Sequence, residues 1–172
     1  MLPLRLLALG MLMVVVDINL TFDLLVDPIG WMLIVYGLTS VLHVHPSFRP
    51  ARWAAIASLV ASLGLVLNLG TVMALVANVV SILVTAAFVW FLCDGLIHTL
   101  GESEAPSTVA NLVRWGVLAT SALTLLGLMI GYNQAAFLPI AIIGGLALIL
   151  ILAGTCWMVA RRPQFTPRTE QP

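Results

Sequence analysis

Seven arginines separate the long apolar runs of this chain, and their placement restricts the fold more than any other feature of the sequence. There is no lysine, so the arginines are the only permanently basic side chains. Arginine near the end of a membrane-crossing helix resists translocation, and an excess of arginine therefore marks cytoplasmic loops. Six crossings with both termini in the cytoplasm would place every arginine on the cytoplasmic side: Arg5, Arg49, Arg52, Arg114, Arg161, Arg162 and Arg168. An odd number of crossings would divide them between the two faces of the membrane.

The composition indicates that lipid is the solvent for most of the exterior. The 172 residues are 62% hydrophobic and only 8% charged, with a mean hydropathy of +1.14. Soluble domains carry about 25% charged residues, so this chain has too few charges to cover a surface that faces water. The formal net charge is zero and there is no large basic patch. A nucleic-acid partner is therefore not expected.

The longest uncharged run must contain a turn. Residues 53–93 carry no charged side chain, and a single helix of that length would be roughly 60 Å long, twice the thickness of the hydrocarbon core. Residues 68–71, with the sequence Asn-Leu-Gly-Thr, are the best turn because asparagine and glycine tolerate a left-handed backbone. The run therefore predicts two antiparallel helices.

The predicted fold class is an all-α membrane protein: one six-transmembrane-helix bundle over residues 1–162, with N and C termini cytoplasmic. The six helices could be arranged as three hairpins. The helices are expected at about residues 4–20, 28–43, 52–67, 72–93, 109–130 and 135–160. Residues 163–172 are polar and rich in proline, so a disordered cytoplasmic tail is expected there.

Two Arg-Trp pairs are predicted to anchor helices at the membrane interface. Arg52 and Trp53 open one expected helix, and Arg114 and Trp115 open another. Arginine suits the headgroup region, while tryptophan is enriched at the boundary between headgroups and hydrocarbon. Both pairs are therefore expected at the cytoplasmic interface.

Small residues at a spacing of four indicate helix faces that pack closely. Gly127 and Gly131 form a GxxxG motif, and Ala141 and Gly145 have the same spacing on the next helix. Small side chains let two helix backbones approach each other in a membrane. Packing within the chain is the expected use, and a dimer face is the alternative.

Asp17 lies inside the apolar run of the first helix, with Asn19 close behind it at the outer end. An ionised group at bilayer depth costs roughly 2.5–3.5 kcal/mol on insertion scales, so Asp17 should face the bundle or the interface. Outward-facing carboxylates could receive cations for transport. The alternative is that both residues are interfacial and structural.

Asp94 and His98 are spaced i, i+4, which places both side chains on one helix face. A carboxylate beside an imidazole could relay protons or hold a metal ion. The favoured alternative is that the helix ends by Cys93, because residues 72–92 already suffice to span a bilayer, and both groups then lie in headgroups and water. Since no paired-ligand motif is present, neither a metal nor a cofactor is expected.

One segment is similar to a known kind of protein. Residues 23–33, DLLVDPIGWML, followed by Gly37 and Leu38, resemble a segment of small multi-pass integral membrane proteins of bacteria whose activity is not known. In those proteins an acidic-Leu-Leu-Pro-Asp start leads into Gly-aromatic-x-Leu, and here Val26 replaces the proline. The resemblance implies a multi-pass protein of the bacterial cytoplasmic membrane and brings no activity or site.

The motifs give no positive case for an enzyme. The sequence has no Walker loop, no Gly-x-Ser-x-Gly, no HExxH and no CxxC. The predicted function is a small accessory or structural protein of the lipid bilayer, which packs with itself as a homo-oligomer or with a membrane-protein partner. The alternative is a small oligomeric transporter or channel that uses intramembrane acidic residues. A water-reachable cavity lined by Asp17, Asn19 or Asp94 would favour transport, and a dry, packed bundle would favour the accessory role.

Overall fold

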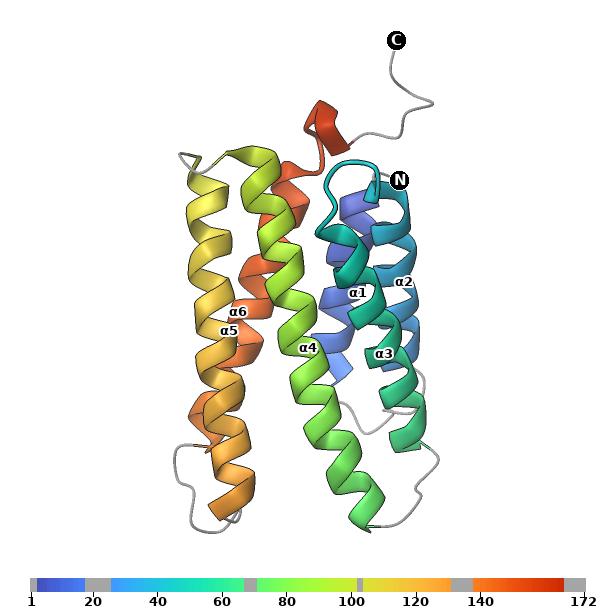
Figure 1. The fold of residues 1–172 in the computed structure, drawn as a ribbon, viewed down its shortest axis with the longest axis vertical. Coiled ribbons are helices and arrows are strands. Elements are labelled where there is room, and N and C mark those ends of the chain that lie inside the picture. The colour runs from blue at the N-terminus through green and yellow to red at the C-terminus, as the bar shows by residue number, and fades with distance from the viewer. Residues whose placement is uncertain (1–2, 18–25, 67–70, 102–103, 131–137, 166–172) are drawn as a thin grey trace.

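The computed structural model describes residues 3–17, 26–66, 71–101, 104–130 and 138–165 (Figure 1). These residues form helices and turns only, with no strand among them. The α-helices are α1 (Pro3–Asp17), α2 (Val26–Val41), α3 (Phe48–Val66), α4 (Thr71–Leu100), α5 (Ala105–Ile130) and α6 (Leu138–Val159), and a 3-10 turn, η1 (Pro163–Phe165), follows. The all-α class predicted from the sequence is confirmed.

The six helices run side by side and pack mainly against their neighbours in the chain (Figure 1). Each helix contacts the next one, and α6 contacts α1, so the succession of contacts closes into a ring. Three helical segments are long and apolar enough to cross a membrane: Leu75–Leu100 of α4, Ala105–Ile130 of α5 and Pro139–Val159 of α6. Pro3–Val15 of α1 is a shorter apolar helix.

Helix α4 continues well past the expected end at residue 93. Its last turns are intact, and the helix ends only at Gly101, whose φ of 89° is the left-handed conformation that glycine adopts at low cost. The Gly101 amide donates to the Ile97 carbonyl at 2.9 Å, which closes the helix. The length needed to cross a bilayer does not stop a helix, whereas a capping glycine does.

Two other helices begin earlier than expected. Helix α3 begins at Phe48 rather than at residue 52, and α5 begins at Ala105 rather than at residue 109. Each has a proline in its first turn, Pro50 and Pro106, where a missing amide donor costs little. Helix α2 begins two residues early and ends at Val41 instead of residue 43. The expected helical residues 18–20, 67 and 135–137, and the expected turn residues 68–70, lie outside the described residues.

The beginning of the expected disordered tail is ordered in the structure. Residues 163–165 form η1, and the Phe165 side chain is only 1% exposed. Its ring meets the ring of Phe48 edge to face, with 6.4 Å between the centroids. One aromatic side chain thus packs the segment against the start of α3. Residues 166–172 lie outside the described residues.

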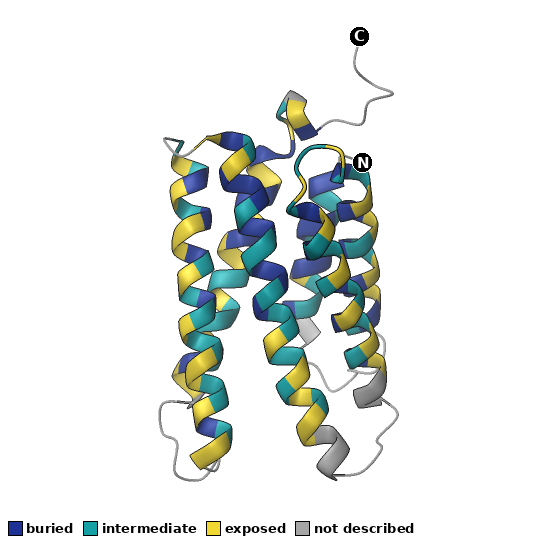
Figure 2. Cartoon of the chain, viewed as in Figure 1, coloured by how far each residue is buried: buried dark blue, intermediate teal, exposed yellow. Residues whose placement is uncertain are grey.

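Buried side chains are concentrated toward the end of the bundle where α1 begins and α4 ends (Figure 2). The largest of them are contributed by several helices: Leu4, Leu7, Met11, Ile34, Leu38, Phe48, Leu92, Leu96 and Leu152. Toward the other end, α4, α5 and α6 expose large apolar side chains such as Leu75, Met129 and Ile140. A surface of this kind suits lipid or another apolar helix better than water.

Helices α1 and α2 approach each other through glycines. A Cβ atom on Gly10 would lie 2.5 Å from the carbonyl oxygen of Gly30, and a Cβ atom on Gly37 would lie 2.8 Å from that of Pro3. Gly30 and Gly37 are one heptad apart, so they lie on the same face of α2, toward α1. Only glycine permits this separation of the two backbones.

Gly37→Ala is therefore expected to lower the free energy of unfolding by about 1–3 kcal/mol, since the added methyl group would meet backbone atoms that cannot move independently. Gly154→Ala is the matched control, because a Cβ atom there meets nothing within 4 Å. The measurement is the thermal midpoint of the purified protein in detergent micelles. Equal midpoints for the two variants would show that the α1–α2 contact is looser than described.

Candidate functional site

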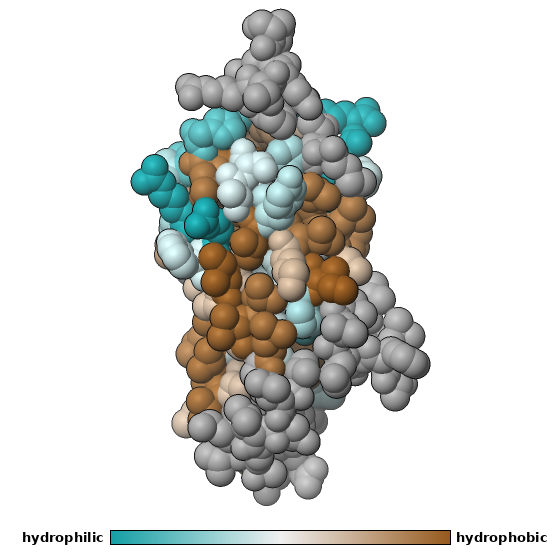
Figure 3. Space-filling view, turned by 90° about the vertical axis from the view of Figure 1, so that its right-hand side faces the viewer, coloured by the Kyte–Doolittle hydropathy of each residue, from teal (hydrophilic) through white to brown (hydrophobic). Residues whose placement is uncertain are grey.

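The arginines of the described chain gather at one end of the bundle, which we call the arginine end. Arg5 of α1 lies over the Trp157 ring of α6, 5.1 Å from its centroid, and Arg162 forms a 2.8 Å ion pair with Glu104. These contacts bring together the start of α1, the end of α6 and the α4–α5 connection. Figure 3 shows hydrophilic residues concentrated toward one end of the face it draws, above a hydrophobic body. The arginine end comprises Arg5, Arg49, Arg52, Arg114, Arg161 and Arg162 with their neighbours.

Asp94 is the central acceptor of a polar network at this end. The Ser47 hydroxyl donates to Asp94 Oδ2 at 2.6 Å, and Arg114 Nη1 donates to Asp94 Oδ1 at 3.4 Å. His98 Nε2 lies 3.6 Å from the same Oδ1 atom. The Asp94 side chain is 27% exposed. One carboxylate therefore ties the α2–α3 connection and α5 to the end of α4.

Two histidines extend the network toward solvent. The rings of His45 and His98 stack with 5.2 Å between centroids and an interplanar angle of 16°. The Ser47 amide donates to His45 Nδ1 at 3.3 Å, so His45 is attached to the segment that supplies the Asp94 contact. Because α4 remains helical through His98, the i, i+4 pair exists as a contact and not only as a spacing.

Arg114 packs between α4 and α5 rather than extending freely from the helix. Its guanidinium carbon lies 4.4 Å from the Trp90 ring centroid and 5.8 Å from that of Trp115. The two tryptophan rings meet edge to face at 5.3 Å, and Arg114 Nη2 donates to Asn111 Oδ1 at 3.1 Å. This predicted anchor therefore also joins two helices. At the other predicted anchor, Arg52 lies 5.6 Å from the ring centroid of Trp53, which is 64% exposed.

The order of contacts at Asp94 is not that of a hydrolytic triad. In a triad the hydroxyl donates to an imidazole, which removes its proton, and the carboxylate orients that imidazole. Here the Ser47 hydroxyl donates directly to the Asp94 carboxylate. No imidazole accepts from this hydroxyl, and His45 Nδ1 accepts only from the Ser47 backbone amide. Among the described residues, no group of three or more His, Cys, Asp or Glu side chains could hold a metal ion. The arrangement is suited to balancing charge and joining helices.

The other predicted site residues are not brought to this network. Asp17 is the last residue of α1, but its side chain, like the whole of Asn19 and Gly131, lies outside what the structure describes. Gly127 is buried in α5. Ala141 is 4% exposed, and a Cβ atom on Gly145 would lie 3.5 Å from Thr120 Oγ1. Ala141 and Gly145 thus lie on the side of α6 that faces α5.

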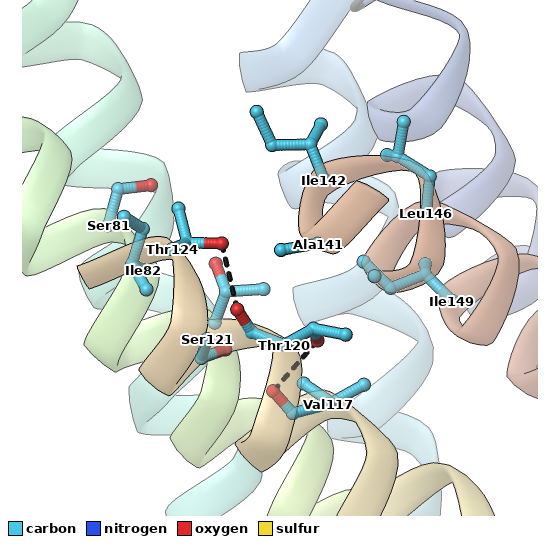
Figure 4. Close-up of a pocket in the computed structure, with 12 residues that line it drawn as sticks. Ser81, Ile82, Val117, Thr120, Ser121, Thr124, Ala141, Ile142, Leu146 and Ile149 are labelled. Atoms are coloured by element: carbon cyan, nitrogen blue, oxygen red, sulfur yellow. Dashed lines mark hydrogen bonds between the residues drawn. The ribbon is translucent and has the colours of Figure 1, made fainter. Parts of the chain in front are cut away.

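A cavity of about 190 Å³ lies between α4, α5 and α6, and Figure 4 shows the residues that line it. In Figure 4 the Ala141 side chain points from α6 toward the threonines of α5. The residues with a hydroxyl group in the wall of this cavity are Ser81, Thr85, Thr120, Ser121 and Thr124. Thr120 and Thr124 donate to carbonyls of their own helix, at 3.1 Å and 2.8 Å. The sequence analysis did not predict this cavity. The i, i+4 spacing of hydroxyl residues on both helices does not identify one, because such residues commonly donate to carbonyls of their own helix.

No protein-family model, no curated protein and no solved structure matches this chain. Inferences about its function therefore depend on its own residues and their geometry.

Asp94→Ala is expected to lower the free energy of unfolding by about 1–3 kcal/mol, because it removes the acceptor of both the Ser47 hydroxyl and the half-buried Arg114 guanidinium. His98→Ala is the matched comparison, and since the His98 side chain is 54% exposed its loss should cost under about 1 kcal/mol. Unfolding by SDS in mixed micelles, followed by circular dichroism, measures both. If His98→Ala cost as much as Asp94→Ala, the carboxylate would not be the centre of the network.

Proposed function

We propose that this chain is a six-span protein of the bacterial cytoplasmic membrane, with both termini in the cytoplasm. The orientation is supported by the six described arginines, all at one end, where positive charge marks the cytoplasmic side. The number of spans is supported by packing, because α1, α2 and α3 lie alongside the long helices rather than outside the bundle. The residue pattern DLLVDPIGWML, which resembles small bacterial multi-pass proteins, supports the same assignment.

We infer an accessory or structural role, in which the protein packs with itself or with a membrane partner and catalyses no reaction. One observation carries this inference. Every acidic or basic side chain that the structure describes lies at the arginine end, apart from Asp27 at the start of α2. Ion pathways and proton relays through membranes use ionisable side chains at depth, and the described middle of the bundle has no Asp, Glu, His or Arg. What it presents instead is apolar surface for lipid or for another helix.

The surface of the long helices supports association. Met129 of α5 is 86% exposed, Ile140 of α6 is 73% exposed, and other large apolar residues adjoin them. Helix association in lipid depends on van der Waals contact between such surfaces and on small residues that permit close approach. Gly154, which is exposed on α6 with no atom near its Cβ position, is one such small residue facing outward.

The alternative function is a small oligomeric transporter or channel, and the hydroxyl-lined cavity favours it. Ser81, Thr85 and Ser121 make no side-chain hydrogen bond within the described chain, so they could bind a polar solute. One copy with so few polar groups at depth would be a poor pore, and a path would need several copies. Asp17 remains a candidate for this role.

Reporter fusions test the topology. Fusions after Arg49 and Gln171 should report cytoplasmic positions, and a fusion after Asn133 should report a periplasmic one, since six crossings return the C-terminus to the side of the arginines. Alkaline phosphatase, active only outside, and green fluorescent protein, fluorescent only inside, give opposite readouts. A periplasmic signal from the Gln171 fusion would rule out six spans.

Co-purification tests the role. Two differently tagged copies, expressed together and solubilised in mild detergent, should co-purify with each other or with one membrane protein in fixed stoichiometry. The matched measurement is solute flux into proteoliposomes made from the same preparation. This flux should equal the flux into liposomes without protein. A monomer without a partner, together with flux abolished by Ser121→Ala, would replace the accessory role with transport.

A further inference from the structure

A second cavity, of about 390 Å³, lies between α4 and α5 at the arginine end. The described residues of its wall are Ile97 from α4 and Ser107, Thr108, Asn111 and Arg114 from the first turns of α5. Four of these five residues are polar, unlike the interior of the bundle. The space exceeds by far the roughly 10–15 Å³ of cavity volume that one water molecule needs. It adjoins the Asp94 network through Arg114 and Asn111.

The cavity wall carries polar groups without a partner. Ser107 is only 2% exposed, yet its hydroxyl makes no hydrogen bond to any described residue. Arg114 Nε is buried and likewise has no acceptor in the described chain. Of these groups only Arg114 Nε is a fully buried atom without a partner, and buried polar groups nearly always have one. Together with the unused Ser107 hydroxyl on the same cavity, it indicates an acceptor from outside the chain. The Thr108 hydroxyl makes only a 3.4 Å contact with the Glu104 carbonyl.

The electrostatics of the cavity favour an anion that carries a single charge. Arg114 contributes a full positive charge, and the N-terminal end of the 26-residue helix α5 adds a partial one. Asp94, whose Oδ1 lies 3.4 Å from Arg114 Nη1, offsets part of the arginine charge. Glu104 is paired with Arg162 at 2.8 Å and adds little. A phosphodiester carries one negative charge, whereas a phosphate monoester carries about −1.5 to −2 at neutral pH.

An apolar surface runs along α5 beside the cavity wall, since Leu112 and Trp115 directly follow Asn111 and Arg114 in the sequence. Leu112 is 69% exposed and Trp115 is 57% exposed, and Leu123 and Leu126 continue the same helix face at 44% and 47%. A ligand that joined a phosphodiester to hydrocarbon chains would fit both parts at once. Phospholipids have this chemistry, and their headgroups lie at the depth where arginine and tryptophan anchor helices.

We propose that Ser107, Asn111 and Arg114 bind a phosphate group in this cavity, and that a phospholipid of the leaflet at the arginine end supplies it. Ser107 Oγ and Arg114 Nε donate to the phosphate oxygens, and the Asn111 amide, whose Oδ1 accepts from Arg114, has its Nδ2 free to donate. The proposal rests on the chain being embedded in a membrane. It does not depend on whether the protein is an accessory subunit or a transporter.

Native mass spectrometry of the full chain in detergent tests this proposal, with dihexanoyl phosphatidylglycerol as the probe. One lipid per chain is expected to bind. Ser107→Ala should weaken binding roughly tenfold, because a hydrogen bond to a charged group contributes about that factor, and Arg114→Gln should weaken it more. Two matched controls at the same end should bind like the parent: Ser40→Ala, whose hydroxyl already donates to its own helix at 3.4 Å, and Arg49→Gln, which is exposed.

The same titration with inorganic phosphate separates the two sources of the group. If phosphate does not displace the lipid, the result supports a phospholipid as the ligand. If phosphate displaces the lipid at equal concentration, the site binds free phosphate, and the proposal that a lipid supplies the group is overturned. Equal lipid binding by the parent, Ser107→Ala and both controls would overturn the proposal outright, since the bound lipid would then be annular. Ser107→Ala removes a single oxygen atom, so this comparison holds even if Arg114→Gln fails to fold. Failure of this site would leave the co-purification result unaffected.

Discussion

The cost of placing an ionised side chain in hydrocarbon governs how this chain is arranged. Each such group would cost roughly 2.5–3.5 kcal/mol at the centre of a bilayer on insertion scales. Three of the helices are long and apolar enough to cross one. The described acidic and basic groups are accordingly withdrawn to the ends, and nearly all of them lie at the arginine end. Charged groups that lie close together are stabilised by partners of opposite charge or by hydrogen-bond donors. Asp94 has both, in Arg114 and Ser47. The polar network and the gathering of charge at one end of the bundle thus have a common cause.

Local features of the fold could be predicted from the sequence, and contacts between distant segments could not. The i, i+4 relation of Asp94 and His98 is visible in any helix, but Ser47 and Arg114 come from 47 and 20 residues away. The spacing of Gly30 and Gly37 indicates a packing face, whereas their partners Gly10 and Pro3 belong to another helix. The end of α4 was misplaced because the thickness of a bilayer was used where Gly101 decides. The hydropathy of a segment indicates whether lipid or water surrounds it, whereas the capping residues determine where its helix ends.

The two cavities also show how little the sequence predicts about contacts between helices. Serine and threonine are common in membrane helices because they can donate to their own backbone, as Thr120 and Thr155 do, so their presence alone predicts nothing. Only the structure separates these residues from Ser107, which has no such partner and lines a cavity beside Arg114. The candidate site therefore emerges from unpaired donors rather than from motifs. It lies near the end where a membrane surface is proposed, which is why a lipid headgroup fits it.

The central claim is that the middle of the bundle is dry while the arginine end is open to water. It can be measured by labelling single cysteines with a membrane-impermeant thiol reagent, in a background where the buried Cys93 and Cys156 are replaced by alanine. The informative positions are Thr85→Cys, midway along α4, and Thr108→Cys, which is exposed at the arginine end. The account predicts that Thr108→Cys is labelled from the cytoplasmic side and that Thr85→Cys is labelled from neither side. Labelling of Thr85→Cys in the folded protein would show that water reaches the centre of the bundle, and it would contradict the account.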